Sequence, residues 1–319
     1  MVIKIIMDLN KNKDMGGIVM QHEYSKTNKG IHNNVPFSIK LKKIIDPKWI
    51  MIILPVAFIL ITTFVPMINL FKLSVVDENG FTLKYLSQVF TEQIYLQVIF
   101  LTLKIAFLVT ISCLVLSYPV SYFIIKLKSP TLKKIILQLI MIPFWISLLV
   151  RTFSWIVVLQ DQGVVNSVLK SLGIISQPIP LVYNTTGVLI GMTHVLLPYM
   201  ILNVYSTMEG IDRNLVQVAQ VMGAKPTRAF WEIFFPLSVP GILSGSMLVF
   251  ILALGYFITP SLLGGAHDMT ISMLIQNNIS NTLNWSLASA LALVLFLITL
   301  VLLGGLLFLM RNHPALKED

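Results

Sequence analysis

Six apolar runs, each long enough to cross a lipid bilayer, constrain the fold of this chain more than any other feature. A membrane-spanning helix needs about 20 consecutive apolar residues. Runs of that length lie at about 50–71, 98–125, 135–159, 186–207, 238–260 and 286–310. The chain is 56% hydrophobic and 12% charged, which is too apolar for an ordinary soluble domain. The sequence therefore predicts an all-α, polytopic membrane protein with six transmembrane helices.

The positions of the lysines and arginines predict how the chain is oriented in the bilayer. Eighteen of the 23 basic residues lie in four segments on one side of the predicted spans, which are 1–49, 126–134, 209–236 and 311–319. Only three lie in segments on the other side. Because basic loops are retained in the cytoplasm, both termini and the segment 209–236 are predicted to be cytoplasmic. The net charge of +9 is thus explained by topology and does not indicate nucleic-acid binding.

These boundaries predict three parts along the chain. Residues 1–49 carry nine lysines and little that could form a core, so we expect a polar cytoplasmic tail. Residues 50–310 form the six-span domain, and residues 311–319 form a short cytoplasmic tail. The segment 209–236 is the most polar part of the domain between two spans.

The segment 209–236 is predicted to form two short amphipathic helices joined by a tight turn. Asp212 is a good N-cap, and apolar residues follow it with the spacing of one helix face, namely Leu215, Val218, Ala219 and Met222. Gly223 stands where a helix end favours the left-handed conformation, and Pro226 suits the first turn of the next helix. Pro236 is expected to end that second helix. The pair is either a docking element for a cytoplasmic protein or an ordinary connecting loop.

Three residues of the predicted spans are candidates for the translocation path or for an interface with another subunit. Arg151 lies in the third run, where a charge usually faces a cavity or a partner, although a purely structural pairing would also explain it. Trp145 and Tyr256 could hold an organic cation through cation–π contacts, or could simply pack between helices. His194 is expected to be an interior histidine with its hydrogen bonds satisfied, and a role in proton coupling is the less favoured alternative.

Several outer features have both a structural and a functional interpretation. Asp161 and Asp268 could attract a cation or contact a binding protein, although solvated loop acids are the commoner case. Short amphipathic helices are expected at 83–90 and at 164–172, the second closed by Gly173.

Pairs of glycines four residues apart, at Gly187 and Gly191 and at Gly241 and Gly245, permit close helix approach.

Catalysis has little support in the sequence. The chain has no G-x-x-x-x-G-K-[ST] loop, no H-E-x-x-H motif and no Cys/His set with metal-ligand spacing, so no catalytic residue, metal site or cofactor is predicted. Its single cysteine, Cys113, excludes an intrachain disulfide. An ion-coupled secondary transporter is an alternative, but it would need carboxylates within the membrane, and no acidic residue lies deep in a predicted span.

The polar segment resembles the cytoplasmic motif of ABC-importer permeases. That motif reads E-A-A, three residues, G, nine residues, I-x-L-P. The same spacing is found here in Gln217-Val218-Ala219, Gly223 and Ile233-Phe234-Phe235-Pro236, with Gln for the Glu, Val for the first Ala and Phe for the Leu. The resemblance implies that the segment docks on an ATPase through Gln217, Ala219, Gly223, Ile233 and Pro236.

The resemblance extends to other stretches of the chain. They are similar to the first permease subunit of spermidine/putrescine importers, and they are Phe81-Thr82-Leu83, Pro143-Phe144-Trp145, Gln162 to Asn166 and Tyr256 to Gly265. This resemblance implies the ABC type I importer permease fold. It also implies a second permease subunit, two copies of a cytoplasmic ATPase and an extracytoplasmic solute-binding protein. The implied substrate is a polyamine, with another small organic solute or iron as the alternative.

Overall fold

The computed structural model describes residues 47–77 and 80–311 and divides the chain into two units, 1–66 and 67–319. The division falls within α3 (Pro47–Val75), an apolar helix that corresponds to the first predicted span. The predicted tails lie outside the described residues, apart from the few that begin α3 and the last residue of the final helix.

Among the described residues of the second unit, the regular elements are helices and one short β-hairpin. Val76 pairs with Phe81, and Asp77 pairs with Gly80, in an antiparallel ladder of two residues on each side. In chain order, the elements that follow α3 are β1 (Val76–Asp77), β2 (Gly80–Phe81), α4 (Lys84–Thr91), α5 (Gln93–Lys126), α6 (Pro130–Met141), the 3₁₀ helix η1 (Ile142–Trp145), α7 (Leu148–Leu159), α8 (Val164–Ser171), α9 (Thr185–Glu209), α10 (Arg213–Val221), α11 (Pro226–Ala229), the π-helix η2 (Phe230–Phe234), α12 (Phe235–Leu254), α13 (Ile258–Leu263), α14 (Ile271–Ser280) and α15 (Trp285–Arg311).

Six helical segments among the described residues are long and apolar enough to cross a membrane, as the sequence predicts. They are Met51–Val75, Gln93–Lys126, Leu148–Ser171, Thr185–Glu209, Pro226–Leu254 and Trp285–Gly305. Four of these coincide with predicted runs to within several residues at each end. The third and fifth predicted runs have different boundaries in the structure.

The predicted third span, 135–159, is not one continuous helix. α6 ends at Met141, and η1 then bends the chain before α7 begins at Leu148. Pro143 has no backbone N–H, and its ring would clash with the carbonyl of a preceding α-helical turn. The chain therefore turns through a short 3₁₀ segment, in which the N–H of Ile146 donates to the carbonyl of Pro143 at 3.3 Å.

The predicted fifth span, 238–260, ends early at Leu254. Gly255 follows, and a new helix, α13, begins at Ile258 with Pro260 in its first turn. A proline is compatible with the first turn of a helix, where its missing N–H would have no intrahelical partner. Pro260 therefore lies in a separate short helix and not in the span.

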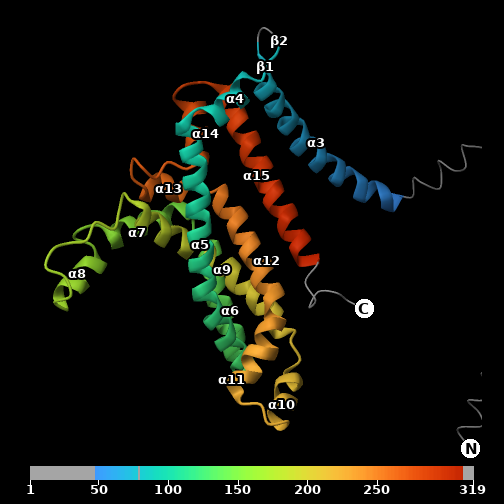
Figure 1. The fold of residues 1–319 in the computed structure, drawn as a ribbon, viewed down its shortest axis with the longest axis vertical. Helices are drawn as coiled ribbons and strands as arrows, with labels where there is room; N and C mark the ends of the chain where they lie inside the picture. The colour runs from blue at the N-terminus through green and yellow to red at the C-terminus, as the bar shows by residue number, and fades with distance from the viewer. Residues whose placement is uncertain (1–46, 78–79, 312–319) are drawn as a thin grey trace, which may run out of the picture. The chain divides into compact units, whose positions relative to one another are not determined.

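The core of the second unit is formed by α9 packed between α5 and α12 (Figure 1). Polar groups also join these helices. The hydroxyl of Ser121 in α5 donates to the carbonyl of Ile201 in α9 at 3.2 Å, and the hydroxyls of Tyr118 and Ser238 lie 3.2 Å apart. Such bonds between membrane helices contribute about 0.6 kcal/mol each. They add specificity to an interface that is stabilised mainly by close packing.

Glycines allow the backbones of α9, α12 and α13 to approach closely, as the paired spacing predicts. A Cβ added to Gly191 would overlap the side chains of Leu263 and Thr259 in α13. A Cβ added to Gly241 of α12 would lie 2.5 Å from Cβ of Thr207 in α9. The helices therefore meet at a separation that larger residues would prevent.

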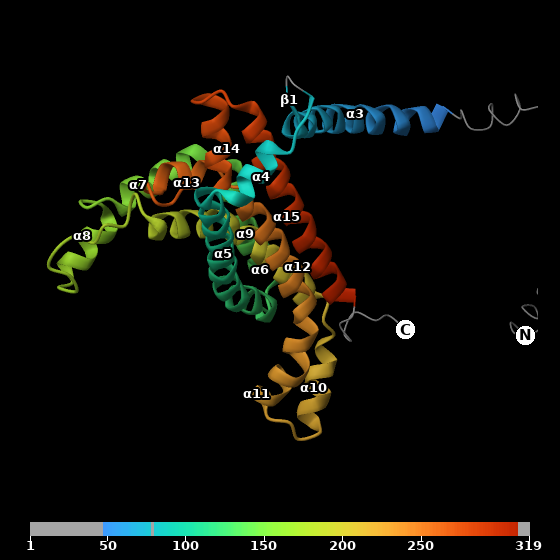
Figure 2. The ribbon, with the colours of Figure 1, turned by 45° about the horizontal axis from the view of Figure 1, so that its top comes forward.

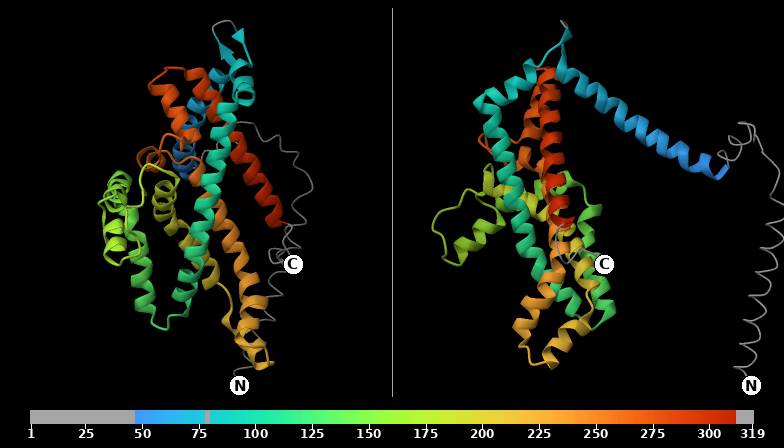
Figure 3. Two further views of the ribbon diagram at one scale, coloured as in Figure 1. Left: turned by 60° about the vertical axis from the view of Figure 1, so that its left-hand side comes forward. Right: turned by 45° about the vertical axis from the view of Figure 1, so that its right-hand side comes forward.

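The two ends of the unit are built differently (Figures 1, 2 and 3). α10 and α11 lie at one end, while the hairpin, α4 and α14 lie at the other. There α4, α14 and α15 share a second buried cluster that includes Val89, Ile271 and Leu291. The predicted amphipathic helices are confirmed as α4 and α8, and Gly173 follows α8 with a φ of +70°.

Asp268 is not a solvated loop acid. It is 4% exposed, and its carboxylate accepts hydrogen bonds from the hydroxyl of Thr185 and from the backbone N–H of Gly265. These bonds tie the loop after α13 to the start of α9, so the residue has a structural role. The sequence interpretation failed because the two segments are 83 residues apart in the chain. Asp161, by contrast, is exposed as expected.

We predict that Gly241→Ala destabilises the helix core. The added methyl group overlaps Thr207, and overpacking of this kind costs about 1–3 kcal/mol. The thermal midpoint of the chain purified in detergent should therefore fall by several degrees. Gly304→Ala in α15 is the matched control, because nothing lies within 4 Å of its added Cβ. Equal midpoints for the two variants would show that close approach at Gly241 is not required.

Candidate functional site: a helix pair at one end and an unpaired arginine

The first helix of the polar segment begins and ends as the sequence predicts. The carboxylate of Asp212 accepts the N–H of Asn214 at 2.9 Å, which caps α10. Gly223 then adopts a φ of +95°, a conformation that glycine reaches without steric cost. The N–H of Gly223 donates to the carbonyl of Gln220 at 3.0 Å, so the turn closes tightly. Pro226 begins α11 as expected.

Pro236 does not end the second helix, contrary to the sequence prediction. The chain stays helical from Pro226 to Leu254, because the π-helix η2 connects α11 to α12. The N–H of Phe235 donates to the carbonyl of Phe230, five residues back, and the wider turn accommodates a proline directly after it. Pro236 stands in the first turn of α12, where its missing N–H is tolerated.

Aromatic rings attach η2 to the end of α5. The ring of Tyr122 lies 5.1 Å from that of Phe230 and 5.3 Å from that of Phe234, both in edge-on geometry. Edge-to-face pairs of this kind contribute about 0.5–1.5 kcal/mol beyond the area they bury. The helix pair is therefore anchored at η2, while its tip around Gly223 projects from the unit (Figure 2).

The predicted apolar face of α10 is largely exposed. Val218 is 57% exposed and Met222 is 83% exposed, and Val221, which the sequence interpretation passed over, is 88% exposed. Trp231 in η2 is also exposed. Exposed apolar side chains clustered at one tip are typical of a surface that another protein covers. The spacing of Val221 three residues after Val218 could have identified it.

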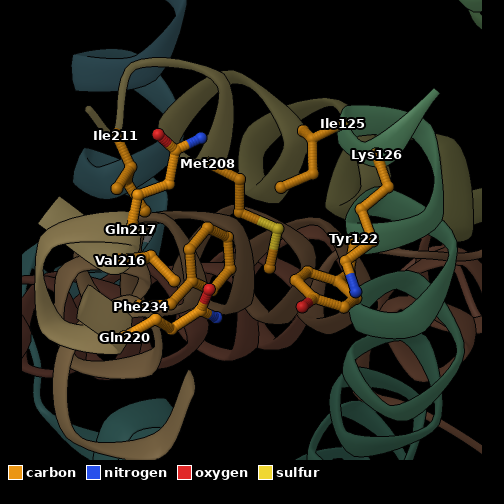
Figure 4. Close-up of a pocket in the computed structure, with 9 residues that line it drawn as sticks. All are labelled: Tyr122, Ile125, Lys126, Met208, Ile211, Val216, Gln217, Gln220 and Phe234. Carbon is orange, nitrogen blue, oxygen red and sulfur yellow. The ribbon is translucent and has the colours of Figure 1, made fainter. Parts of the chain in front are cut away.

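A cavity of about 210 Å³ lies behind α10 (Figure 4). Its walls come from the ends of α5 and α9 and from α10 and η2, and they are Tyr122, Ile125, Lys126, Met208, Ile211, Val216, Gln217, Gln220 and Phe234. The ammonium of Lys126 lies 4.3 Å from the centre of the Tyr122 ring. Gln217 and Gln220 of α10 both line this cavity, and the amide of Gln220 points toward Phe234.

The five predicted docking residues lie on α10, on the turn after it, on η2 and on the first turn of α12. Gly223 is exposed in the turn, and Ala219 is half-buried on α10. Ile233 and Pro236 are half-buried. Gln217 is exposed and also lines the cavity.

The three residues assigned to a path or an interface lie near the two helix breaks. Trp145 closes η1 and is 89% exposed. Arg151 lies in the first turn of α7. Tyr256 lies in the turn between α12 and α13, half-buried against the core.

Arg151 faces a cavity of about 400 Å³. His194 also lines this cavity, and no described acidic residue does. Its Nε and Nη1 atoms are buried and have no hydrogen-bond partner among the residues that the structure describes, and the same is true of Nδ1 of His194. The ring of Trp155 packs edge-on against His194 with centroids 5.4 Å apart. His194 is half-buried, and because its Nδ1 has no described partner, the prediction of a fully hydrogen-bonded interior histidine is wrong.

The comparisons with known proteins agree with this arrangement. A bacterial alginate ABC transporter, crystallised with an alginate pentasaccharide-bound periplasmic protein, contains a chain of the same fold, with a TM-score of 0.69 at 17% identity. The match covers 89% of this chain and 99% of that one. The fold is that of ABC type I importer permeases.

Other known proteins are more similar to this chain in sequence than the alginate transporter chain is. The spermidine/putrescine transport system permease protein PotB of Escherichia coli is 34% identical over 68% of this chain and 77% of its own. PotB of Haemophilus influenzae is 32% identical over 82% of this chain and 94% of its own. Residues 47–310 match the family model for the binding-protein-dependent transport system inner membrane component, and the chain belongs to that family.

Proposed function

We propose that this chain is a permease subunit of a polyamine importer. The observation that carries the proposal is its similarity to PotB of two bacteria, both named as spermidine/putrescine transport proteins, at 32–34% identity over most of their length. The match to an ABC transporter of a chemically different solute supports the transport class but not the substrate. The substrate assignment therefore rests on the sequence relatives.

The complete importer would contain four chains in addition to this one. We propose a second permease subunit, two copies of a cytoplasmic ATPase and an extracytoplasmic solute-binding protein. The bound periplasmic protein in the alginate transporter complex supports the last of these. ATP hydrolysis belongs to the separate ATPase, since this sequence has no phosphate-binding loop.

The tip formed by α10 and α11 is the proposed docking surface for the ATPase. Val221 and Met222 supply exposed apolar area, and a protein partner that covers this area gains hydrophobic free energy. Gly223 sets the turn that presents these residues, while Ala219, Ile233 and Pro236 hold the helices that carry it. Gln217 is a contact residue only where the partner reaches the cavity behind α10.

The orientation of the chain follows from this docking. The tip, the turn between α5 and α6, and both termini would face the cytoplasm, as the basic residues indicate. Trp145 and Tyr256 would then lie at the depth of the helix breaks, facing the translocation path or the second permease. Alternating access would arise when ATP-driven closure of the ATPases moves the tip and, with it, α12.

Deletion of the gene should abolish ATP-dependent uptake of radiolabelled spermidine and putrescine in the source bacterium. The reason is that no path through the membrane is left when one permease subunit is missing. Uptake should return when the chain is supplied from a plasmid. Normal polyamine uptake in the deletion strain would assign the importer to another small organic solute or to iron, and solute binding to the partner binding protein would then identify it.

Gly223→Asp should abolish transport while the chain still inserts into the membrane. The side chain would be strained at a φ of +95°, and a charge would be placed within the apolar tip. Uptake and co-purification of the ATPase should both be lost. Gly80→Asp is the matched control, because Gly80 has a φ of +107° and nothing within 4 Å of an added Cβ. Equal loss in both variants would attribute the effect to backbone strain and not to docking.

A further inference from the structure

Arg151 carries a charge that the described residues do not neutralise. The ion pairs among them are Lys133 with Glu209 and Arg228 with Glu232, and neither involves α7. A guanidinium cannot lose its proton in a protein, so burial leaves it charged. A buried charge without a partner is strongly destabilising, and the penalty is larger in a membrane protein than in a soluble one. An acceptor from outside this chain would remove the penalty.

Arg151 lies in the third segment that is long and apolar enough to cross a membrane, three residues after that segment begins at Leu148. A charged side chain in such a segment is costly unless it faces a cavity or pairs with an opposite charge.

The cavity at Arg151 opens on a face of α7 that the described residues leave uncovered. Val150 is 57% exposed and Val157 is 59% exposed, while only Thr152 and Leu159 of α7 are buried. A second cavity of about 370 Å³ shares Trp155 and His194 with the first. Apolar side chains thus surround a recess with unpaired donors at its base, which a partner helix with one acidic side chain would fit.

We propose that a carboxylate on a membrane helix of the second permease subunit enters this cavity and accepts hydrogen bonds from Arg151. A carboxylate supplies both the opposite charge and two acceptor oxygens, which suits the two unpaired nitrogens. A polyamine is a cation and is repelled by Arg151, so the substrate is not the partner. This inference rests on the proposed function, because it needs a second permease subunit.

The test replaces Arg151 by Met in the complete transporter and measures how much second permease co-purifies with the tagged chain in mild detergent. Loss of one partner leaves the other charge buried, so the ratio of the two permeases should fall about tenfold. Lys104→Met is the matched control, since Lys104 is the other basic residue in a predicted span and is exposed. Its ratio should equal that of the unchanged transporter.

Each acidic residue in the spans of the second permease is then replaced by its amide in the Arg151→Met background. One such change should restore the ratio to within about twofold, because removal of both charges leaves neither unpaired. If Arg151→Met lowers the membrane content of the chain itself, the same change should restore that content. If none of these changes restored the ratio, the proposal would be overturned.

The outcome also separates this proposal from the proposed function. If the unchanged chain does not co-purify with a second permease, the proposed function fails and the carboxylate proposal fails with it. If the unchanged chain co-purifies and Arg151→Met does so equally well, only the carboxylate proposal is overturned.

Discussion

The structure depends on the close approach of α9 to the helices on either side of it. Apolar side chains gain little by leaving lipid for a helix interface, so membrane helices associate mainly through tight packing and interhelical hydrogen bonds. Gly191 and Gly241 remove the side chains that would keep the backbones apart. Asp268 adds a polar tie between the start of α9 and the loop after α13. Together these contacts position both helix breaks and the helix that leads to the exposed tip.

The features that the sequence predicted correctly are those set by local chemistry. Apolar runs of sufficient length are membrane spans whatever surrounds them, and Asp212 caps α10 through its own neighbours. Gly223 adopts its positive φ because of the turn in which it lies. The family motif was also recognised from spacing alone, since spacing survives the substitutions at Gln217, Val218 and Phe235.

The features that the sequence did not predict depend on distant partners or on a choice between two local solutions. The burial of Asp268 follows from its contact with Thr185, which no local pattern encodes. Pro236 could end a helix or begin one, and the π turn before it allows the second. Arg151 was recognised as unusual, but the absence of a described partner for its Nε and Nη1 became visible only in three dimensions.

The helical run from Pro226 to Leu254 is continuous, and its 29 residues rise about 40 Å at the usual pitch. It is not a straight rod, because the π turn of η2 is followed by Pro236 and then by Pro240. Prolines and π turns are the places where helices bend. A displacement of the turn after α10 would therefore reach the far end of α12 only through this bend, which the ring of Tyr122 in α5 contacts directly.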